Sequence, residues 1–402
     1  MDRFVARQPI FDESLKVWAY ELLFRSSPEN FFVETDGDEA TSRVIANSFL
    51  LFGIDAIAED GRAFINFTRN LLIKDYAIAL PRERVVVEVL ETVEPDEEVV
   101  AACRKLKKHG FVLALDDFVA DSALEPLVDL ADIVKVDFML TDAASQRRLA
   151  SQLLPRGVRL LAEKIETHEQ LHLAKDMGYT LFQGFFFSKP VIISRKEIPG
   201  NKLHYLRILK ELGKSQVDLK NLARTISQDV SISYKLLRYV NSTAMGLRQQ
   251  VTSIERAVYL LGEQGSRRWI SLAVLTGLGE DRTPELVKTS LIRAKFAELL
   301  GVACGREDRR SDYFLMGLFS LVDALLGRPM AEILEELPLA EDVRAGLLGE
   351  ENLMRAVLDL IAAYEQGDWR SFARRIEALG IDDSEIPAHY CDAVQCQNDL
   401  LA

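Results

Sequence analysis

The sequence predicts an α/β plus all-α protein, with a modified (β/α)8 barrel of the TIM type in residues 1–198 and a helical domain in residues 199–402. Three observations support this prediction. The length of 402 residues fits two domains, since a domain commonly holds about 100–200 residues. In the first half, short apolar runs alternate with segments of helical periodicity. After the turn-rich segment Ile198–Asn201 these runs stop, and apolar residues recur at helical spacing.

About eight short runs, rich in β-branched and aromatic residues, are the predicted barrel strands. The first two lie close enough to form a hairpin, and helical segments such as Glu39–Phe52, Asp96–His109 and His168–Met177 separate later runs. Alternation of this kind implies parallel strands joined by crossover helices. The predicted strands are Phe4–Phe11, Val17–Phe24, Phe64–Phe67, Val85–Leu90, Val112–Asp116, Ile133–Phe138, Arg159–Ile165 and Leu181–Phe187.

The second half is predicted to be helical. Pro284 and Pro329 stand where a helix start or a turn uses proline. The predicted helices are Lys202–Leu212, Leu219–Gln228, Ile232–Asn241, Ile254–Leu261, Gly265–Thr276, Pro284–Leu300 and Asp312–Leu325, with further helices up to the end of the chain.

The composition restricts the function classes and the compartment. A formal net charge of −13 argues against direct nucleic-acid binding, which requires a basic surface. No apolar stretch reaches the roughly 18 residues of a membrane span, and the first residues do not form a signal peptide. We therefore expect a soluble cytoplasmic protein that binds no membrane and whose cysteines are reduced. These cysteines are Cys103, Cys304, Cys391 and Cys396, of which the last two form only a weak C-x4-C zinc signal.

Polar residues lie within or directly after nearly every predicted strand. Taken singly, each is explained equally well as a salt-bridge partner or a strand cap. In a barrel, however, the carboxyl ends of the strands converge on the face where catalysis occurs. Several carboxylates at one mouth repel each other unless cations lie among them, and oxygen ligands favour Mg²⁺ or Mn²⁺. The residues are Glu21, Asn66, Glu88, Glu91, Asp116, Asp117, Lys135, Asp137, Glu163, Glu166 and Gln183.

Eight motifs, in the same order over residues 1–195, resemble those of EAL domains. The motifs are Gln8-Pro9-Ile10 (QPI), Glu21-Leu22-Leu23-Phe24-Arg25 (EALLR, with Leu22 for alanine), Ile65-Asn66-Phe67-Thr68 (the asparagine motif), Val87-Glu88-Val89-Leu90-Glu91 (LEITE), Asp116-Asp117-Phe118 (DDFG), Lys135-Val136-Asp137 (KID), Ala162–Thr167 (AEGVET) and Gln183-Gly184-Phe185 continuing to Ser188-Lys189-Pro190 (QGY…SKP). The resemblance implies an EAL-type phosphodiesterase that hydrolyses cyclic di-GMP to linear pGpG with two divalent metals, Mg²⁺ or Mn²⁺.

The resemblance also implies a role for each matching residue. The implied metal ligands are Glu21, Asn66, Glu88, Asp116 and Asp117, the last for the second metal. The implied catalytic residues are Lys135, Glu163 and Asp117, of which Lys135 and Glu163 position or deprotonate the attacking water. The implied substrate-binding residues are Gln8, Arg25 and Gln183. Glu91 is implied to anchor the loop that follows Asp117.

Two departures from the EAL pattern bear on activity. The segment Val119–Leu124 lacks both glycines of DDFGTGYSSL, although glycine permits backbone angles closed to other residues. In EAL domains this loop contributes to the second metal site and to the dimer, so the resemblance also implies a homodimer through the barrel. Lys164 replaces the glycine of AEGVET. We expect Lys164 to be solvated, since most lysines are exposed, with contact to a substrate phosphate as the alternative.

The second half resembles the HDOD module, a relative of HD-domain phosphohydrolases. The matching segments are Asp229–Ser242 and Ser253–Gly262, and Gly317–Asp323 suits proteins that combine the two modules. Only His204 and His389 lie in this half, and aspartate follows neither, so a catalytic HD metal site is not predicted. We therefore interpret the helical domain as a regulatory module with an unidentified protein partner.

Three functional hypotheses follow. The first is a metal-dependent cyclic di-GMP phosphodiesterase regulated through the HDOD module, which the retained Glu21, Glu88, Asp116, Lys135 and Glu163 favour. The second is a weak or inactive barrel that serves as a cyclic di-GMP receptor, which the altered loop Val119–Leu124 favours. The third is a scaffold in which both halves contact other proteins. Metal affinity separates the first two hypotheses from the third, and turnover separates the first from the second.

Overall fold

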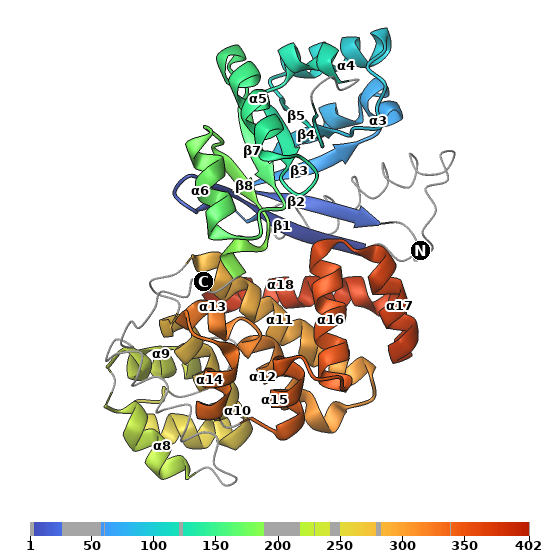
Figure 1. Cartoon of the computed structure of the whole chain (residues 1–402). Helices are drawn as coiled ribbons and strands as arrows, with labels where there is room; N and C mark the ends of the chain where they lie inside the picture. The colour runs from blue at the N-terminus through green and yellow to red at the C-terminus, as the bar shows by residue number, and fades with distance from the viewer. Residues whose placement is uncertain are drawn as a thin grey trace. The chain divides into compact units, whose positions relative to one another are not determined.

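The structure is a computed structural model, which describes residues 4–25, 58–59, 61–119, 124–188, 218–228, 230–241, 250–278, 283–337 and 339–401. The chain divides into two compact units (Figure 1). The first unit is Met1–Lys189 together with Ala362–Ala378 and Asp382–Gln395, and the second is Pro190–Ile361 with Leu379–Ile381 and Cys396–Ala402. The predicted helix Glu39–Phe52 and the predicted boundary between residues 198 and 199 fall outside the described residues, so both stay predictions.

The first unit contains a closed barrel whose strands pair in sequence order, from β1 to β8 and back to β1. β1 is antiparallel to both of its neighbours, and the strands from β2 onwards pair in parallel. The prediction of a modified barrel that begins with a hairpin is thus confirmed. The strands are β1 Phe4–Asp12, β2 Val17–Arg25, β3 Arg62–Phe67, β4 Val85–Val89, β5 Val112–Leu115, β6 Ile133–Asp137, β7 Arg159–Glu163 and β8 Leu181–Gln183.

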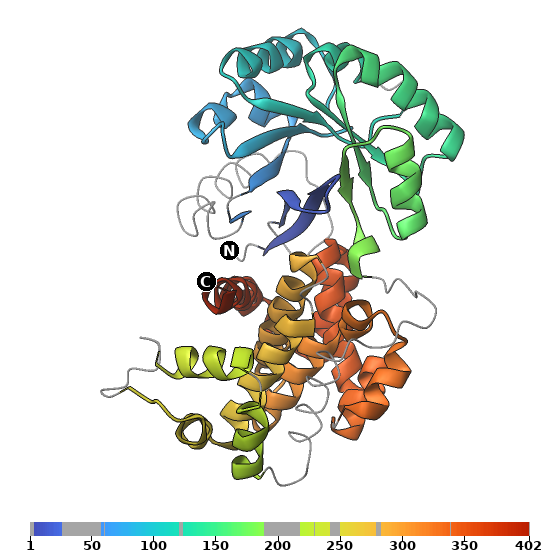
Figure 2. The ribbon, with the colours of Figure 1, turned by 90° about the vertical axis from the view of Figure 1, so that its left-hand side faces the viewer.

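Helices cover the outside of these strands, as the teal and green ribbons of Figure 2 show. Local sequence explains their ends. In α4 the Asp96 carboxylate accepts a hydrogen bond from Val99 N at 2.9 Å, and acidic residues in the first turn complement the helix dipole. Thr167 and Gln170 form a capping box at the start of α6. The helices are α3 Arg69–Ile73, η1 Tyr76–Ala79, α4 Glu97–Lys108, η2 Glu125–Leu130, α5 Ala143–Leu153, η3 Leu154–Arg156, α6 His168–Asp176 and η4 Phe185–Ser188.

The barrel interior contains a layer of apolar side chains. Its members are Ile10, Ala19, Phe64, Val86, Ala114, Ile133, Leu161 and Leu181, all at most 1% exposed. Because side chains alternate along a strand, the residue two positions away faces the same interior. On β2 to β8 that residue lies toward the carboxyl end of the strand, which we call the barrel mouth.

The second unit is helical, as predicted. The helix α10 contains a break at Gly262, whose φ of +66° separates the two predicted helices Ile254–Leu261 and Gly265–Thr276.

The prediction of one helix over Asp312–Leu325 is wrong, since α12 ends at Phe319 and α13 begins at Val322. The Ser320 hydroxyl donates to Gly317 O at 2.7 Å, a local bond that competes with helix continuation. The predicted helix Lys202–Leu212 lies outside the described residues.

The described helices of the second half of the chain are α8 Leu219–Ile226, α9 Val230–Val240, α10 Ile254–Leu278, α11 Pro284–Ala303, η6 Glu307–Arg309, α12 Arg310–Phe319, α13 Val322–Leu326, α14 Met330–Glu336, α15 Glu341–Leu348, α16 Leu353–Gln366, α17 Trp369–Leu379, η7 Asp383–Glu385 and α18 Ile386–Leu401. Within the described residues, no helix combines the length and the apolar character that crossing a bilayer requires.

The C-terminal segments of the first unit carry an aromatic cluster. The ring centroid of Tyr364 lies 4.8 Å from that of Tyr390, 5.3 Å from Phe372 and 5.4 Å from Trp369. Aromatic pairs at these distances contribute about 0.5–1.5 kcal/mol each beyond the area that they bury. The cluster holds the end of α16 together with α17 and α18, and so fixes the residues of α16 that reach the barrel.

Candidate active site

The mouth of the barrel contains a layer of polar side chains directly above the apolar layer. On every strand, the polar residue stands two positions from an interior apolar residue, as Lys135 stands from Ile133 and Glu88 from Val86. The periodicity of two therefore turns all of these side chains toward the barrel axis. The layer consists of Gln8, Glu21, Asn66, Glu88, Asp116, Lys135, Glu163 and Gln183.

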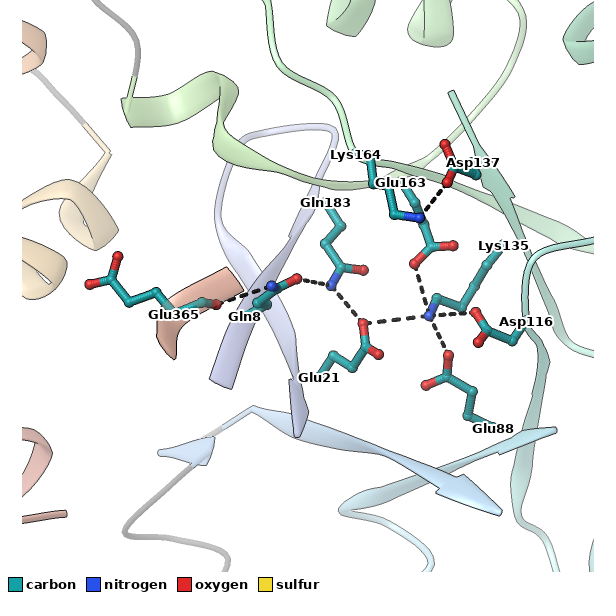
Figure 3. A network of polar contacts seen from close by, with 10 residues as sticks. All are labelled: Gln8, Glu21, Glu88, Asp116, Lys135, Asp137, Glu163, Lys164, Gln183 and Glu365. Carbon is teal, nitrogen blue, oxygen red and sulfur yellow. Dashed lines mark hydrogen bonds and ion pairs between the residues drawn. The ribbon is translucent and has the colours of Figure 1, made fainter. Parts of the chain in front are cut away.

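Lys135 is the centre of this layer (Figure 3). Its side chain is 1% exposed, and its Nζ lies 2.8 Å from Glu163 Oε1 and 2.9 Å from Asp116 Oδ1. The same Nζ lies 3.4 Å from Glu21 Oε2 and also pairs with Glu88. One ammonium group thus faces carboxylates from four different strands, which leaves an excess of negative charge at the mouth.

The environment shifts the proton affinity of these groups. Burial raises the pKa of Glu88 well above its ordinary value, although Lys135 opposes this. Burial likewise raises the pKa of Glu163 to about 8. Burial acts to raise the pKa of Asp116, but the charge of Lys135 and the hydrogen bonds to this carboxylate together outweigh burial, so the pKa is lowered. Desolvation disfavours the ammonium of Lys135, yet the surrounding carboxylates raise its pKa well above the usual range, so this lysine is charged.

A chain of amide hydrogen bonds connects Glu21 to the C-terminal part of the same unit. Gln183 Nε2 donates to Glu21 Oε2 at 2.6 Å and to Gln8 Oε1 at 3.0 Å. Gln8 Nε2 in turn donates to the backbone carbonyl of Glu365 at 3.1 Å (Figure 3). Gln8 on β1, the first strand, and Gln183 on β8, the last strand, thereby fix the orientation of the Glu21 carboxylate.

Two residues at the mouth have left-handed backbone conformations. Asp117 follows β5 with a φ of +41°, and Lys164 follows β7 with a φ of +54°. Between them, Asp137 ends β6 and is 3% exposed. Its Oδ1 accepts hydrogen bonds from Met139 N at 2.7 Å and Leu140 N at 3.0 Å, and its Oδ2 pairs with Lys164.

Buried oxygen atoms at the mouth fit a divalent cation. Asn66 Oδ1, Glu88 Oε2 and Gln183 Oε1 are buried and accept no hydrogen bond from the described residues. A buried polar atom that lacks a partner costs about 1–3 kcal/mol, which coordination by a cation would offset. Ligand oxygens of Asp116, Asp117 and Glu163 lie within 4.8 Å of one another. All of these donors are hard oxygens, the set that Mg²⁺, Mn²⁺ and Ca²⁺ prefer.

Comparison with known proteins agrees with this geometry. Residues 45–190 match the model of the EAL domain, and residues 198–336 match the model of the HDOD domain. The chain is 39% identical to the Bacillus subtilis protein YuxH over 406 residues, which cover 99% of this chain and 98% of YuxH. It is 36% identical to the Vibrio cholerae protein named cyclic di-GMP phosphodiesterase CdgJ, covering 99% of this chain and 93% of CdgJ.

This chain belongs to the EAL–HDOD family. The EAL–HDOD barrel brings together most of the residues that the sequence singles out: the eight-residue polar layer and Asp117 all lie at one mouth. Glu91 is exposed in the turn after β4. Residues 120–123 of its predicted partner loop, Val119–Leu124, lie outside the described residues, so the anchoring role of Glu91 stays a prediction. Arg25 ends β2, but its side chain is not among those described.

The expectation that Lys164 is merely solvated is incomplete. Its side chain is 52% exposed, but it forms an ion pair with the buried carboxylate of Asp137. Sequence analysis assigns no role to Asp137, although the position of this carboxylate near the end of a predicted strand can be read from the sequence. The sequence signal at Lys164 is the replacement of a glycine of the EAL motif by lysine. The backbone there is left-handed, a conformation that glycine adopts readily and lysine does not.

The sequence predicts no HD-type metal site for the two histidines of the second half of the chain, and the structure describes one of them. His204 lies outside the described residues. His389 is half-buried, and its Nδ1 contacts the carbonyl of Glu385 one turn earlier in α18. The four cysteines, all among the described residues, are free thiols.

Proposed function

We propose that this EAL–HDOD protein hydrolyses cyclic di-GMP to linear pGpG in a reaction that depends on a divalent metal, Mg²⁺ or Mn²⁺, and that the HDOD module regulates the reaction. The observation that carries the proposal is the layer of eight polar residues at the mouth. Each of the eight has the residue type that the EAL motifs have at that position. The full-length relative from Vibrio cholerae, named a cyclic di-GMP phosphodiesterase, supports the same activity.

We assign the oxygens at the mouth to two cation positions. Glu21, Asn66, Glu88 and Asp116 would hold one ion, and Asp117 with Asp116 and Glu163 would hold a second. A divalent ion held there would supply Lewis-acid chemistry to the scissile phosphodiester and would lower the pKa of the attacking water. Gln183 orients the Glu21 carboxylate through its 2.6 Å hydrogen bond, which keeps one Glu21 oxygen directed into the layer.

Lys135 and Glu163 act on the attacking water. Lys135 donates to Glu163 Oε1 at 2.8 Å, which fixes this carboxylate near the centre of the mouth as an acceptor for a water proton. The lysine ammonium also stabilises the negative charge that grows on the phosphoryl oxygens in the transition state. Hydrolysis adds one water across one phosphodiester: the new bond forms at phosphorus, and the ribose 3′ oxygen leaves and takes up a proton.

The substrate carries two negatively charged phosphodiesters, which the excess of carboxylates at the mouth repels. Cations must offset this repulsion before the substrate can bind. Arg25, Gln8 and Gln183 are the proposed contacts to the dinucleotide. Gln8 Nε2 already donates to the Glu365 carbonyl, which holds the Gln8 amide in one orientation. This orientation presents Gln8 as a fixed part of the substrate-binding wall.

A second candidate function is that of a cyclic di-GMP receptor without useful turnover. The altered segment after Asp117 favours it, since Val119 and Asp121 stand where EAL domains have the two glycines of this loop. We further propose that the protein acts in the cytoplasm as a homodimer through the barrel, and that the HDOD module contacts a protein partner.

The experiment that separates the two candidates uses the purified full chain with cyclic di-GMP and Mg²⁺ or Mn²⁺. Nucleotides are separated by chromatography, with EDTA as the control, and binding is titrated in parallel. We expect EDTA-sensitive pGpG. Binding without any product would replace the enzyme by the receptor, and neither binding nor product would overturn both.

A further inference from the structure

The end of α16 presents a backbone carbonyl to which the helix supplies no donor. The chain leaves the helix at Gly367, whose φ is +67°. Asp368 N donates to Ala363 O at 2.9 Å, the six-to-one bond of a Schellman motif. In a longer helix, Trp369 N would donate to Glu365 O, but it donates to Gly367 O at 2.9 Å instead. The carbonyl of Glu365 is therefore open to a donor from another part of the chain.

The donor that reaches this carbonyl is Gln8 on β1. Gln8 Nε2 lies 3.1 Å from Glu365 O (Figure 3). Gln8 Oε1 accepts a hydrogen bond from Gln183 Nε2 at 3.0 Å, so both ends of the Gln8 amide are bonded. Such an amide has one orientation, because a flip would place its oxygen against the Glu365 carbonyl. The end of α16 thus fixes the side chain of a proposed substrate contact.

A second contact ties the same turn to β2. A Cβ added at Gly367 would lie 2.7 Å from Leu23 Cδ1 and 3.7 Å from its Cγ. Leu23 stands between Glu21 and Arg25 on this strand. The turn at Gly367 therefore packs directly on the strand that carries a proposed metal ligand and a proposed substrate contact, and a larger residue there would force the two apart.

The helix α16 belongs to both units of the chain. Residues 353–361 are part of the second unit, and residues 362–366 are part of the first. The second unit also contains residues 198–336, which match the HDOD model. Because a helix transmits displacement along its length, a shift of its first residues would move the Glu365 carbonyl.

The bonds around Gln8 predict which kinetic constant such a shift would change. Gln183 Nε2 donates to Gln8 Oε1 and, separately, to Glu21 Oε2 at 2.6 Å. Loss of the bond to Glu365 O would free the Gln8 amide, whereas Gln183 would still hold Glu21. A displaced turn should therefore weaken substrate binding and leave the chemical step nearly unchanged.

We propose that the turn at the end of α16, residues 364–367, is a positioning segment of the substrate site, through which the HDOD module sets the affinity for cyclic di-GMP. The inference rests on the proposed binding of cyclic di-GMP at the barrel mouth. Glu365 and Gly367 act through Gln8 and Leu23, and the substrate itself contacts Gln8.

The test is a double-mutant cycle on the full chain. Gly367→Leu pushes the turn away from Leu23, and Gln8→Leu removes the amide. Gly380→Leu is the matched control, because Gly380 follows α17 with a φ of +64° and an added Cβ there meets nothing within 4 Å. The Kd of cyclic di-GMP is measured by calorimetry in Ca²⁺, which oxygen ligands also accept, and the kcat and KM of pGpG formation are measured in Mg²⁺.

Gly367→Leu should raise Kd and KM about tenfold, as expected for one lost hydrogen bond, while kcat changes less than about twofold. Gln8→Leu should raise Kd at least as much, and the double variant should bind no more weakly than Gln8→Leu alone. Leu23→Ala in the Gly367→Leu chain reopens the space and should return Kd to within about twofold of the parent. Gly380→Leu should match the parent.

Hydrogen exchange tests the link to the second unit. Coupling between two sites is reciprocal, so cyclic di-GMP at the mouth should stabilise the helix that holds Gln8. Saturating cyclic di-GMP should slow amide exchange in residues 353–361 of the parent about fivefold, and should not slow it in Gln8→Leu. Exchange in the parent that does not respond to the ligand would overturn the proposed regulation through α16.

Three results in the cycle would overturn the positioning role. They are a parent-like Kd in Gly367→Leu, effects of Gly367→Leu and Gln8→Leu that multiply in the double variant, and a Kd that Leu23→Ala does not restore. An equal loss in Gly380→Leu would also overturn it, because backbone strain would then explain the effect.

Failure of the proposed function looks different. The parent would then bind cyclic di-GMP, with the same differences in Kd among the variants, but would form no pGpG. A parent that binds no cyclic di-GMP with either ion would overturn both proposals.

Discussion

Replacing Lys135 by methionine should destabilise the barrel severely unless a divalent ion is present. The side chain is 1% exposed and pairs with four carboxylates, Glu21, Glu88, Asp116 and Glu163. Removing one partner of a buried ion pair commonly costs about 3–5 kcal/mol, since an uncompensated charge is left inside. For a domain of this size each kcal/mol lowers the midpoint of thermal unfolding by about 2–4 °C, so we expect a loss of about 10 °C.

Calorimetry of the full chain in EDTA and in Mn²⁺ measures this effect. Mn²⁺ should recover at least half of the loss in Lys135→Met, because the cation replaces the missing positive charge among the same oxygens. Lys105→Met is the matched control: Lys105 pairs with Asp75 at 2.5 Å, but its side chain is 47% exposed, so we expect a change of less than about 1 kcal/mol. A loss of less than about 2 °C in EDTA, or equal losses with and without Mn²⁺, would refute this reasoning.

Three further predictions test other parts of the structure. Glu21→Ala should lower kcat about 10²-fold or more while the circular dichroism spectrum stays unchanged, and parent-like turnover would show that the site is misassigned. Gly184→Ala should destabilise the barrel by about 2–4 kcal/mol in urea titrations, because its Cβ would lie 2.2 Å from Ile165 O; a neutral effect would contradict the close packing. Arg309 lowers the pKa of Asp342 mainly through their hydrogen bond, so the pair stabilises above the ordinary aspartate pKa and this contribution disappears as the pH falls through the lowered value. Arg309→Met should therefore cost about 1 kcal/mol at pH 7 and nothing near pH 2, and a cost independent of pH would indicate packing instead.

The sequence predicts the polar layer well because a barrel strand has a fixed periodicity. Once Val86 and Ile133 face the interior, Glu88 and Lys135 must face it too, and parallel strands bring their carboxyl ends to one mouth. The spacing therefore suffices to collect these side chains from eight strands, without any knowledge of which atoms meet.

Other features depend on contacts that no local pattern encodes. The hydrogen bond from Gln8 to the Glu365 carbonyl joins residues 357 positions apart. The inclusion of Ala362–Ala378 in the barrel unit likewise depends on tertiary packing, since these residues have the same helical periodicity as those before them. Lys135 pairs with four carboxylates because their side chains meet at the barrel axis, and no local sequence pattern encodes this meeting.

The conformation of Lys164 shows how a departure from a family pattern gains meaning only in three dimensions. In the sequence it is one lysine among many, and most lysines are solvated. The structure gives it a φ of +54° and a buried partner, Asp137, at the mouth of the barrel. The constraint comes from Gly184, which directly follows β8, about twenty residues later in the chain.

The most direct test of the central claim is the formation of pGpG from cyclic di-GMP by the purified full chain in Mg²⁺ or Mn²⁺, followed by chromatography beside the Glu21→Ala variant. The account predicts product from the parent, none in EDTA, and at most about one hundredth of the parent rate from the variant. Binding of cyclic di-GMP by the parent with no pGpG under any of these conditions would contradict it.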